Sequence, residues 1–373
     1  MKFTINREQF LKGLTIASKA IGSKSPIPVM INVKLTLDEK GLNIIGSNNE
    51  LSIKTIVPYM IGETTIIRAS REGSTLVASR IITEIVRRIE GTELSFEVFD
   101  GTIVQIEDGR SNFKLNSVKP EEYPEIDLEP TGTKVELNAK EFTKMVEQTA
   151  FAASQKEQRP ILTAVNLEAI DGKLVATATD SARLAKKEIV CPSPAHFSVN
   201  IPAKVLSEIS KLLENEPALE LVVSDKKALF LFDGTIVSSR LISGDYPNTR
   251  NIVPRSYNYK LEANAAEMLR AMDRVSLLSG ERENVVKLTM SDSGVEVSSK
   301  SAQTGSAVES ITTCQFTGER LEISFNAEYV GAAIRACQSE DVTLGFVGEM
   351  KPFSVRDAKD DSQIQIVTPV RTY

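Results

Sequence analysis

LVASRIITEIVRRIEG at residues 76–91, PAKVLSEISKLLEN at residues 202–215 and NAEYVGAAIRACQS at residues 326–339 carry one helical pattern at equal intervals. In each stretch four residues are spaced i, i+1, i+4 and i+8, which places them on one face of an α-helix. Corresponding positions lie 124 residues apart in both intervals, so three copies would fill nearly all 373 residues. The four-residue sets are Ile81, Ile82, Ile85 and Ile89; Val205, Leu206, Ile209 and Leu213; and Tyr329, Val330, Ala333 and Cys337. The sequence therefore predicts three copies of one module.

The segments around these helices repeat as well. Residues 91–101, 216–226 and 339–349 alternate apolar and polar side chains, as strands do. A further helical pattern opens each module, at residues 7–20, 139–153 and 265–279, and acidic turn residues recur at Asp108, Asp233 and Asp357. The string FDGTIV occurs at residues 99–104 and 232–237, a spacing of 133 that does not fit the repeat. We expect two different hairpins that share an Asp-Gly turn.

The order strand, helix, several strands, helix, several strands predicts an α+β fold with antiparallel sheets. Proline-containing segments, Tyr123-Pro124 to Pro130 and Tyr246-Pro247 to Pro254, occupy matching places and mark the module boundaries. The predicted modules are residues 1–128, 129–254 and 255–373.

Composition and missing motifs narrow the function. The net charge of −6 argues against a protein that binds nucleic acid by bulk charge. Three cysteines without metal-ligand spacing, and no apolar run near the ~20 residues that cross a bilayer, predict a soluble cytoplasmic protein with no membrane association. Phosphate-binding, zinc-protease and nucleophile-elbow motifs are absent, and the single histidine, His196, stands in a predicted loop. We expect no catalysis, no cofactor and no metal.

The six predicted helices each carry lysine or arginine at polar positions. Because the chain is acidic overall, a surface shared by these helices would be basic and would hold a phosphate backbone loosely, without sequence preference. The other interpretation is a solvated face with ion pairs, since Glu84, Glu208 and Asp273 lie among the basic residues. The basic positions are Arg7, Lys12, Lys19, Arg80, Arg87, Arg88, Lys140, Lys144, Lys204, Lys211, Arg270, Arg274 and Arg335.

Several short motifs, in order along the chain, resemble the bacterial sliding clamp, the β subunit of DNA polymerase III. They are MKFTINREQFLKGL at residues 1–14, SKSPIPVMINVKL at 23–35, ATATDSARLA at 176–185, FNAEYV at 325–330 and PVRT at 369–372. The resemblance spans the full chain. It implies the DNA clamp fold, with two copies closing head to tail into a dimeric ring around double-stranded DNA. It also implies partners: the replicative polymerase α subunit, the clamp loader δ subunit, repair polymerases, mismatch repair proteins and ligase.

The resemblance also implies three sites. A groove between the second and third modules would accept short apolar partner peptides. Lys24, Arg80 and Lys156 would contact DNA, and Phe113, Leu277 and Leu278 would form the dimer interface. The sequence departs from some relatives at Ser181, Ala182, Asn251 and Glu283, which bears on the shape of the groove. The groove positions are Leu162, Thr179, Arg183, Leu184, Pro247, Ile252, Asn326, Tyr329, Val367, Pro369, Val370 and Arg371.

Two other functions compete with a DNA-encircling processivity factor. One is a repeat scaffold that binds only proteins, in which the basic helix faces are merely solvated. The other is an unrecognised hydrolase or transferase, for which the sequence nominates no polar cluster.

Overall fold

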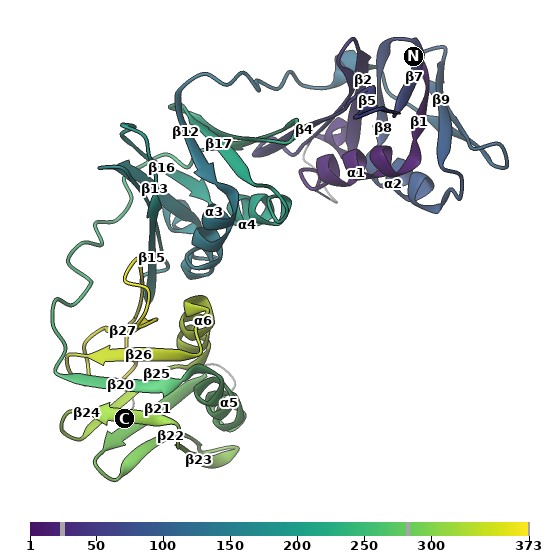
Figure 1. Cartoon of the computed structure of the whole chain (residues 1–373). Helices are drawn as coiled ribbons and strands as arrows, with labels where there is room; N and C mark the ends of the chain where they lie inside the picture. The colour runs from purple at the N-terminus through teal and green to yellow at the C-terminus, as the bar shows by residue number, and fades with distance from the viewer. Residues whose placement is uncertain (23–26, 281–283, 372–373) are drawn as a thin grey trace. The chain divides into compact units, whose positions relative to one another are not determined.

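The computed structural model describes residues 1–22, 27–280 and 284–371, and the chain forms two compact units (Figure 1). The first unit comprises Met1–Lys140 and Lys211–Leu241, and the second comprises Glu141–Ser210 and Ile242–Tyr373. In both units helices pack against antiparallel sheets, which confirms the predicted α+β class. The central third of the chain contributes strands to both.

The first unit contains two large sheets. In the larger sheet, β19 from the central third of the chain pairs with β4 from the first third, so one sheet runs through the joint between them. The five-stranded sheet has the order β11 (Asn112–Asn116), β10 (Ile103–Glu107), β9 (Glu93–Phe99), β1 (Lys2–Asn6) and β7 (Ile67–Arg71). The eight-stranded sheet has the order β12 (Thr133–Asn138), β17 (Ala218–Val223), β18 (Lys227–Phe232), β19 (Thr235–Arg240), β4 (Leu51–Val57), β3 (Gly41–Ser47), β2 (Asn32–Asp38) and β8 (Gly73–Ala78). Strands β5 (Met60–Ile61) and β6 (Thr64–Thr65) form a small separate hairpin.

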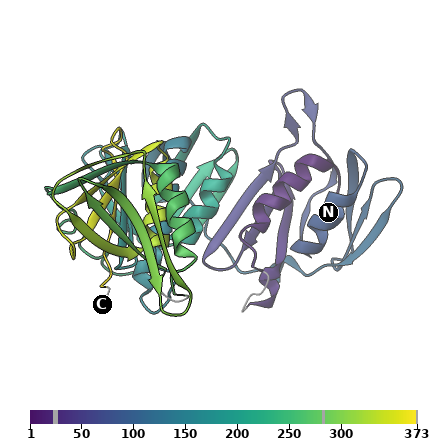
Figure 2. The same ribbon diagram turned by 90° about the horizontal axis from the view of Figure 1, so that it is seen from below.

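Helices α1 (Arg7–Ser18) and α2 (Ser79–Arg88) lie side by side in the first unit (Figures 1 and 2). The hydroxyl oxygens of Ser18 and Ser79 are 2.8 Å apart, which joins the two helices. The buried face of α2 includes Ile82 and Val86. Ile81 is 51% exposed, so its predicted place on that face was wrong. The buried positions of α2 follow the i, i+4 spacing from Ile82, and Ile81 lies beside that stripe.

The second unit repeats the arrangement. Strand β15 from the central third pairs with β28 from the last third, so a continuous sheet again crosses the joint. The nine-stranded sheet has the order β16 (Phe197–Pro202), β13 (Ala164–Ile170), β14 (Lys173–Thr179), β15 (Arg183–Val190), β28 (Gln363–Val367), β27 (Phe353–Arg356), β26 (Asp341–Phe346), β20 (Tyr259–Asn264) and β24 (Cys314–Thr317). The four-stranded sheet has the order β23 (Gly305–Ile311), β22 (Gly294–Ser301), β21 (Val285–Ser291) and β25 (Leu321–Asn326).

Two α-helices belong wholly to the second unit, α5 (Ala265–Ser276) and α6 (Ala327–Cys337), and they pack against each other. Helices α3 (Ala139–Glu147) and α4 (Ala203–Leu212) contain residues assigned to both units. Short 3-10 helices are η1 (Pro28–Ile31), η2 (Pro120–Glu122), η3 (Ala150–Ala152) and η4 (Pro160–Thr163). The helical repeat at 124-residue spacing is confirmed, because α2, α4 and α6 begin at residues 79, 203 and 327.

The two FDGTIV strings form different hairpins, as predicted. The first closes the turn between β9 and β10, and the second closes the turn between β18 and β19. In both turns the aspartate and glycine have positive φ, 48° and 70° at Asp100-Gly101 and 38° and 66° at Asp233-Gly234. That conformation suits a two-residue hairpin, so the shared string reflects turn chemistry.

Two long connectors, residues 117–132 and 241–258, contain no strand or α-helix. Each inserts a tyrosine into the protein interior, Tyr123 in the first and Tyr246 in the second. Burial raises the pKa of both tyrosines to about 12. No helix in the described ranges is long and apolar enough to cross a membrane.

Candidate functional site

A small pocket of about 200 Å³ lies in the second unit, where the ends of β14 and β28 and the start of β15 meet the connector 241–258. Six of the twelve residues predicted for the groove line it: Leu162, Thr179, Arg183, Leu184, Pro247 and Ile252. Arg159, Ser181, Thr249, Ile366 and Thr368 complete the lining. Aliphatic walls with a few fixed polar groups suit a short apolar peptide.

Arg183 forms one wall of this pocket and is held from two sides. Its Nε lies 3.0 Å from the carboxylate Oδ2 of Asp180. Its guanidinium carbon lies 4.5 Å from the ring centroid of Tyr329 and 5.6 Å from that of Phe151. A guanidinium stacked on aromatic rings gains cation–π attraction and loses rotamer freedom. With a side chain only 16% exposed, Arg183 presents a fixed surface to a ligand.

The turn between β14 and β15 is built by side-chain hydrogen bonds. The Thr179 hydroxyl donates to the carbonyl of Arg183 (2.6 Å) and accepts from the N–H of Ser181 (3.1 Å). Oδ1 of Asp180 accepts from the N–H of Ala182 and of Arg183. Ser181 adopts φ of +81°, a left-handed conformation that favours glycine. The hydrogen bonds of Thr179 and Asp180 hold Ser181 in this conformation, which a residue with a side chain rarely adopts.

Tyr246 fixes the connector against this turn. The N–H of Thr179 donates to the Tyr246 hydroxyl (3.0 Å), and that hydroxyl donates to the carbonyl of Ala164 (3.4 Å). Pro247 follows directly, so the bond places a pocket wall on the strand end that carries Thr179. From the sequence, Tyr246 is expected only to mark a module boundary. A tyrosine beside a proline in a matching connector was the available signal.

The other six predicted groove residues have different surroundings. The Asn326 side chain caps α6 by accepting from the N–H of Glu328 and of Tyr329 (2.9 and 3.2 Å). Tyr329 stacks on Arg183, whereas Val367 and Pro369 are buried. Val370 and Arg371 line a second cavity of about 500 Å³. Met350, 49% exposed, lines the same cavity and was missed, since nothing in its sequence neighbourhood distinguishes it from a loop residue.

Ala182 and Asn251, two further positions expected to affect the shape of the groove, lie in different segments. The carbonyl of Ala182 accepts from the N–H of Thr368 (2.9 Å), next to the pocket. Asn251 is exposed in the connector, and Glu283 lies outside the described residues.

Two of the three predicted DNA-contacting residues, Arg80 and Lys156, are described, one in each unit. Arg80 is exposed on α2 and forms no ion pair with a described residue, whereas Arg87 and Arg88 of the same helix both pair with Glu84. Lys156 is exposed in the loop before η4. Lys24 lies outside the described residues. Arg80 and Lys156 are therefore accessible cations in their respective units.

The predicted interface residues lie on the edge strand of one sheet and directly after one helix. Phe113 is half-buried on β11, the edge strand of the five-stranded sheet. Leu277 follows α5 and is 78% exposed, and Leu278 beside it is half-buried. Exposed aliphatic side chains of this size indicate an interaction surface when they cluster. No group of histidine, cysteine, aspartate or glutamate within residues 1–22, 27–280 and 284–371 is arranged to hold a metal ion.

Comparison with known proteins agrees with this architecture over the full chain. Family models described as the N-terminal, central and C-terminal domains of the DNA polymerase III beta subunit match residues 1–127, 136–248 and 250–371. Beta sliding clamps from Bacillus subtilis and Staphylococcus aureus are both 33% identical to this chain, with complete coverage of both proteins. The crystal structure of the Bacillus subtilis DNA polymerase sliding clamp matches with a TM-score of 0.96 at 33% identity, covering all of both chains. The DNA polymerase III beta chain from Streptococcus pneumoniae matches with a TM-score of 0.95 at 32% identity, again with complete coverage. The chain therefore belongs to the bacterial sliding clamp family, the β subunits of DNA polymerase III.

Proposed function

We propose that this protein is a processivity factor, a ring of two copies that encircles duplex DNA and tethers the replicative polymerase. The observation that carries the proposal is the match of all three domain models and of solved sliding clamps along the whole chain. Members of this family are non-catalytic accessory subunits of the polymerase. A repeat scaffold that binds only proteins would require the same fold without the DNA function of its relatives.

Ring closure is supported by the way the modules join within the chain. At each joint within the chain, a strand of one module pairs with a strand of the next module: β4 with β19, and β15 with β28. By their order in the repeat, β11 corresponds to β19 and β28, whereas β23 corresponds to β4 and β15. Strands β11 and β23 are edge strands, each with one paired neighbour. Pairing β11 of one copy with β23 of another would repeat the same joint and remove both open edges.

The side chains on these two edges support this pairing. Phe113 on β11 packs against the hydrophobic core of the first unit, and Ala307 on β23 packs against that of the second. A sheet continued from one copy into the other would therefore continue both apolar layers. Leu277 and Leu278, just after α5, would cover the new junction.

The DNA contact proposed for Arg80, Lys156 and Lys24 is weak and independent of sequence. Phosphate contacts of this kind position a protein without reading bases. An acidic protein of net charge −6 can remain on DNA because enclosure, not affinity, holds it there. We place the protein in the cytoplasm, on replicating DNA.

The pocket around Arg183 would bind the apolar peptides of the polymerase α subunit, the clamp loader δ subunit, repair polymerases, mismatch repair proteins and ligase. Its support is the combination of aliphatic walls with the fixed guanidinium of Arg183. Membership of the family supports the proposal of these partners.

Primer extension on a singly primed circular template tests the function. With polymerase, clamp loader and ATP present, adding this protein should lengthen the product made in one binding event, measured with excess trap DNA. Unchanged product length with an active loader and polymerase would contradict the proposal. A loader from the same organism is required, since the loader must recognise the groove.

A further inference from the structure

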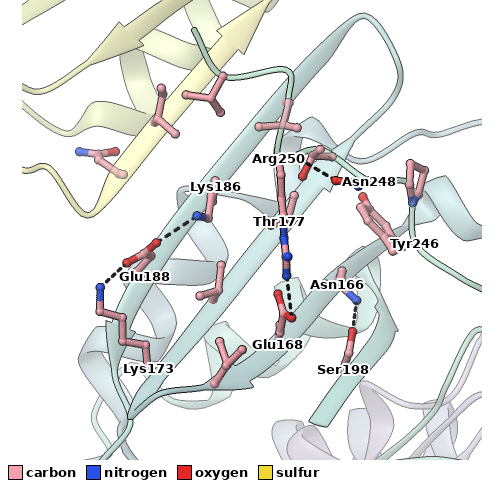
Figure 3. A pocket seen from close by; sticks show the side chains of 18 of the residues that line it. Asn166, Glu168, Lys173, Thr177, Lys186, Glu188, Ser198, Tyr246, Asn248 and Arg250 are labelled. Carbon is pink, nitrogen blue, oxygen red and sulfur yellow. Dashed lines mark hydrogen bonds and ion pairs between the residues drawn. The ribbon is translucent and has the colours of Figure 1, made fainter. Parts of the chain in front are cut away.

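A larger, polar cavity of about 870 Å³ shares a wall with the pocket around Arg183. Leu184, Pro247 and Thr249 line both. The floor of this cavity is one face of β13, β14 and β15, and part of the connector 241–258 borders it (Figure 3). A peptide anchored in the small pocket therefore has a polar space next to it.

Most cations of this cavity are already neutralised by neighbouring carboxylates. Lys173 and Lys186 both pair with Glu188, at 2.9 and 3.0 Å, and Arg250 extends to Glu168 at 3.6 Å (Figure 3). The Lys173–Glu188 pair crosses from β14 to β15, the Lys186–Glu188 pair lies within β15, and the Arg250–Glu168 pair joins the connector to the floor. Among these pairs, the two lysines share the single carboxylate of Glu188, so that group keeps one positive charge.

Arg356 differs from the other cations. It lines the same cavity from β27, and it forms no ion pair with any described residue. One Nη atom donates to the hydroxyl of Tyr257 at 3.1 Å, and its Nε is buried without an acceptor among the residues described. Because a buried donor without a partner is unfavourable, a carboxylate near this guanidinium would be stabilised.

Arg356 and Lys186 flank one apolar residue of the intervening strand. Lys186 pairs with Ile364 across β15 and β28, and Val355 pairs with Gln365 across β28 and β27. Because β27 and β28 are antiparallel, Arg356 lies opposite Ile364. Lys186 on β15 and Arg356 on β27 therefore lie on either side of Ile364 of the strand between them, β28. Arg356, together with the one excess positive charge of the Lys173–Glu188–Lys186 group, favours an anion over this part of the sheet.

We propose that the polar cavity binds acidic side chains that flank the apolar anchor of a partner peptide, with Arg356 as the residue that selects them. This inference rests on the proposed role of the adjacent pocket. Three exposed aspartates, Asp171, Asp245 and Asp361, also line the cavity and oppose an anion. The gain is therefore small, about three-fold in affinity, as for solvent-accessible ion pairs.

Fluorescence anisotropy with the full-length protein tests the proposal. The probes are peptides with leucine and phenylalanine anchors and blocked termini, which removes any terminal carboxylate. Each is extended at one end by two glycines, two glutamates or two lysines. Glutamate should tighten binding about three-fold over glycine at one end only, because the cavity adjoins one side of the pocket. Lysine should not tighten it, and added salt should reduce the glutamate gain.

Variants assign the effect to Arg356. Arg356→Gln should abolish the glutamate gain, and Arg356→Lys should retain most of it. Arg270→Gln is the matched control. Arg270 is exposed on α5 and lines neither cavity, and its substitution removes the same positive charge. Unfolding midpoints check that each variant is folded.

The possible failures are distinguishable. A glutamate gain that persists in Arg356→Gln, or no gain in the wild type while the glycine peptide binds, would overturn this inference alone. If the glycine peptide does not bind at all, the proposed pocket is wrong and this inference falls with it.

Discussion

The hydroxyl of Tyr246 links the connector 241–258 to the candidate pocket. It accepts the N–H of Thr179 and donates to the carbonyl of Ala164. Tyr246→Phe removes both bonds and leaves the ring in place. Losing a buried hydrogen bond costs about 1 kcal/mol, so we expect peptide affinity to fall about three- to five-fold. Anisotropy titration with a short apolar peptide measures this change.

Tyr59→Phe is the control for that variant. The Tyr59 hydroxyl donates to the carbonyl of Asp38 at 2.7 Å in the first unit, so its loss is chemically comparable. Peptide affinity should stay unchanged in Tyr59→Phe. Equal weakening by the two variants would show that Tyr246 acts only through general stability.

Arg183 and Pro369 test the location of the pocket. Arg183→Ala removes the guanidinium stacked on Tyr329, and Pro369→Ala alters the buried segment after β28. The double variant should bind apolar peptide at least ten-fold more weakly, about 1.4 kcal/mol or more. Native mass spectrometry should still find a dimer. Loss of the dimer would mean that the pocket and the interface are not separate sites.

At the scale of elements, the exposed end of α5 tests the proposed ring interface. Leu277→Asp places a charge where an apolar contact is expected, so the dimer should dissociate at micromolar concentration. Val190, at the end of β15, is also 78% exposed and provides the matched control Val190→Asp. Sedimentation velocity distinguishes dimer from monomer. A dimer that survives Leu277→Asp would contradict the assignment.

Glu267 joins helix α5 to the segment after β23 through hydrogen bonds. Its carboxylate accepts from the N–H groups of Thr312 and Thr313, at 2.9 and 2.8 Å, and from the Thr312 hydroxyl. These hydrogen bonds, led by the Thr312 N–H, lower the pKa of Glu267 from 4.5 to about 2. A lowered folded-state pKa stabilises the fold above pH 4.5, and this contribution disappears as the pH falls toward 2.

Glu267→Gln should therefore have a lower unfolding midpoint than the wild type at pH 7. The difference should shrink as the pH falls from 4.5 toward 2, because the wild-type carboxylate then also becomes neutral. Glu296→Gln, at an exposed position on β22, is the control and should show little difference at either pH. A difference between Glu267→Gln and wild type that is constant with pH would exclude the ionised carboxylate as its cause.

The elements were largely predictable, because helix and strand periods are local. The buried faces of α4 and α6 follow the predicted residues, such as Leu206 and Val330. The prediction that Ile81 lies on the buried face was wrong, because the adjacent Ile81 and Ile82 fit one helical face almost equally well. The roles of Met350 and Arg356 could not be predicted, since they depend on neighbours from distant parts of the chain, whereas Tyr246 had a signal in the Tyr-Pro pair of its connector. The pairing of β4 with β19 likewise follows from tertiary structure, not from a sequence period.

For the whole molecule, enclosure of DNA would reconcile the net charge of −6 with the DNA function, because retention would not depend on bulk positive charge. Exposed cations such as Arg80 would then need only weak phosphate contacts, which fade with added salt. Retention on closed circles should be nearly insensitive to salt, because it depends on an intact ring. The salt dependence of retention therefore distinguishes enclosure of DNA from binding by charge, which added salt weakens.

The most direct measurement follows the protein after a closed DNA circle is cut. Fluorescently labelled protein is loaded on nicked circular DNA with clamp loader and ATP, separated from free protein, and treated with a restriction enzyme that cuts once. We predict that the protein co-elutes with uncut circles and is released within minutes of cutting, as it slides off the ends. Protein that stays bound to linear DNA with free ends would contradict the account of a sliding ring.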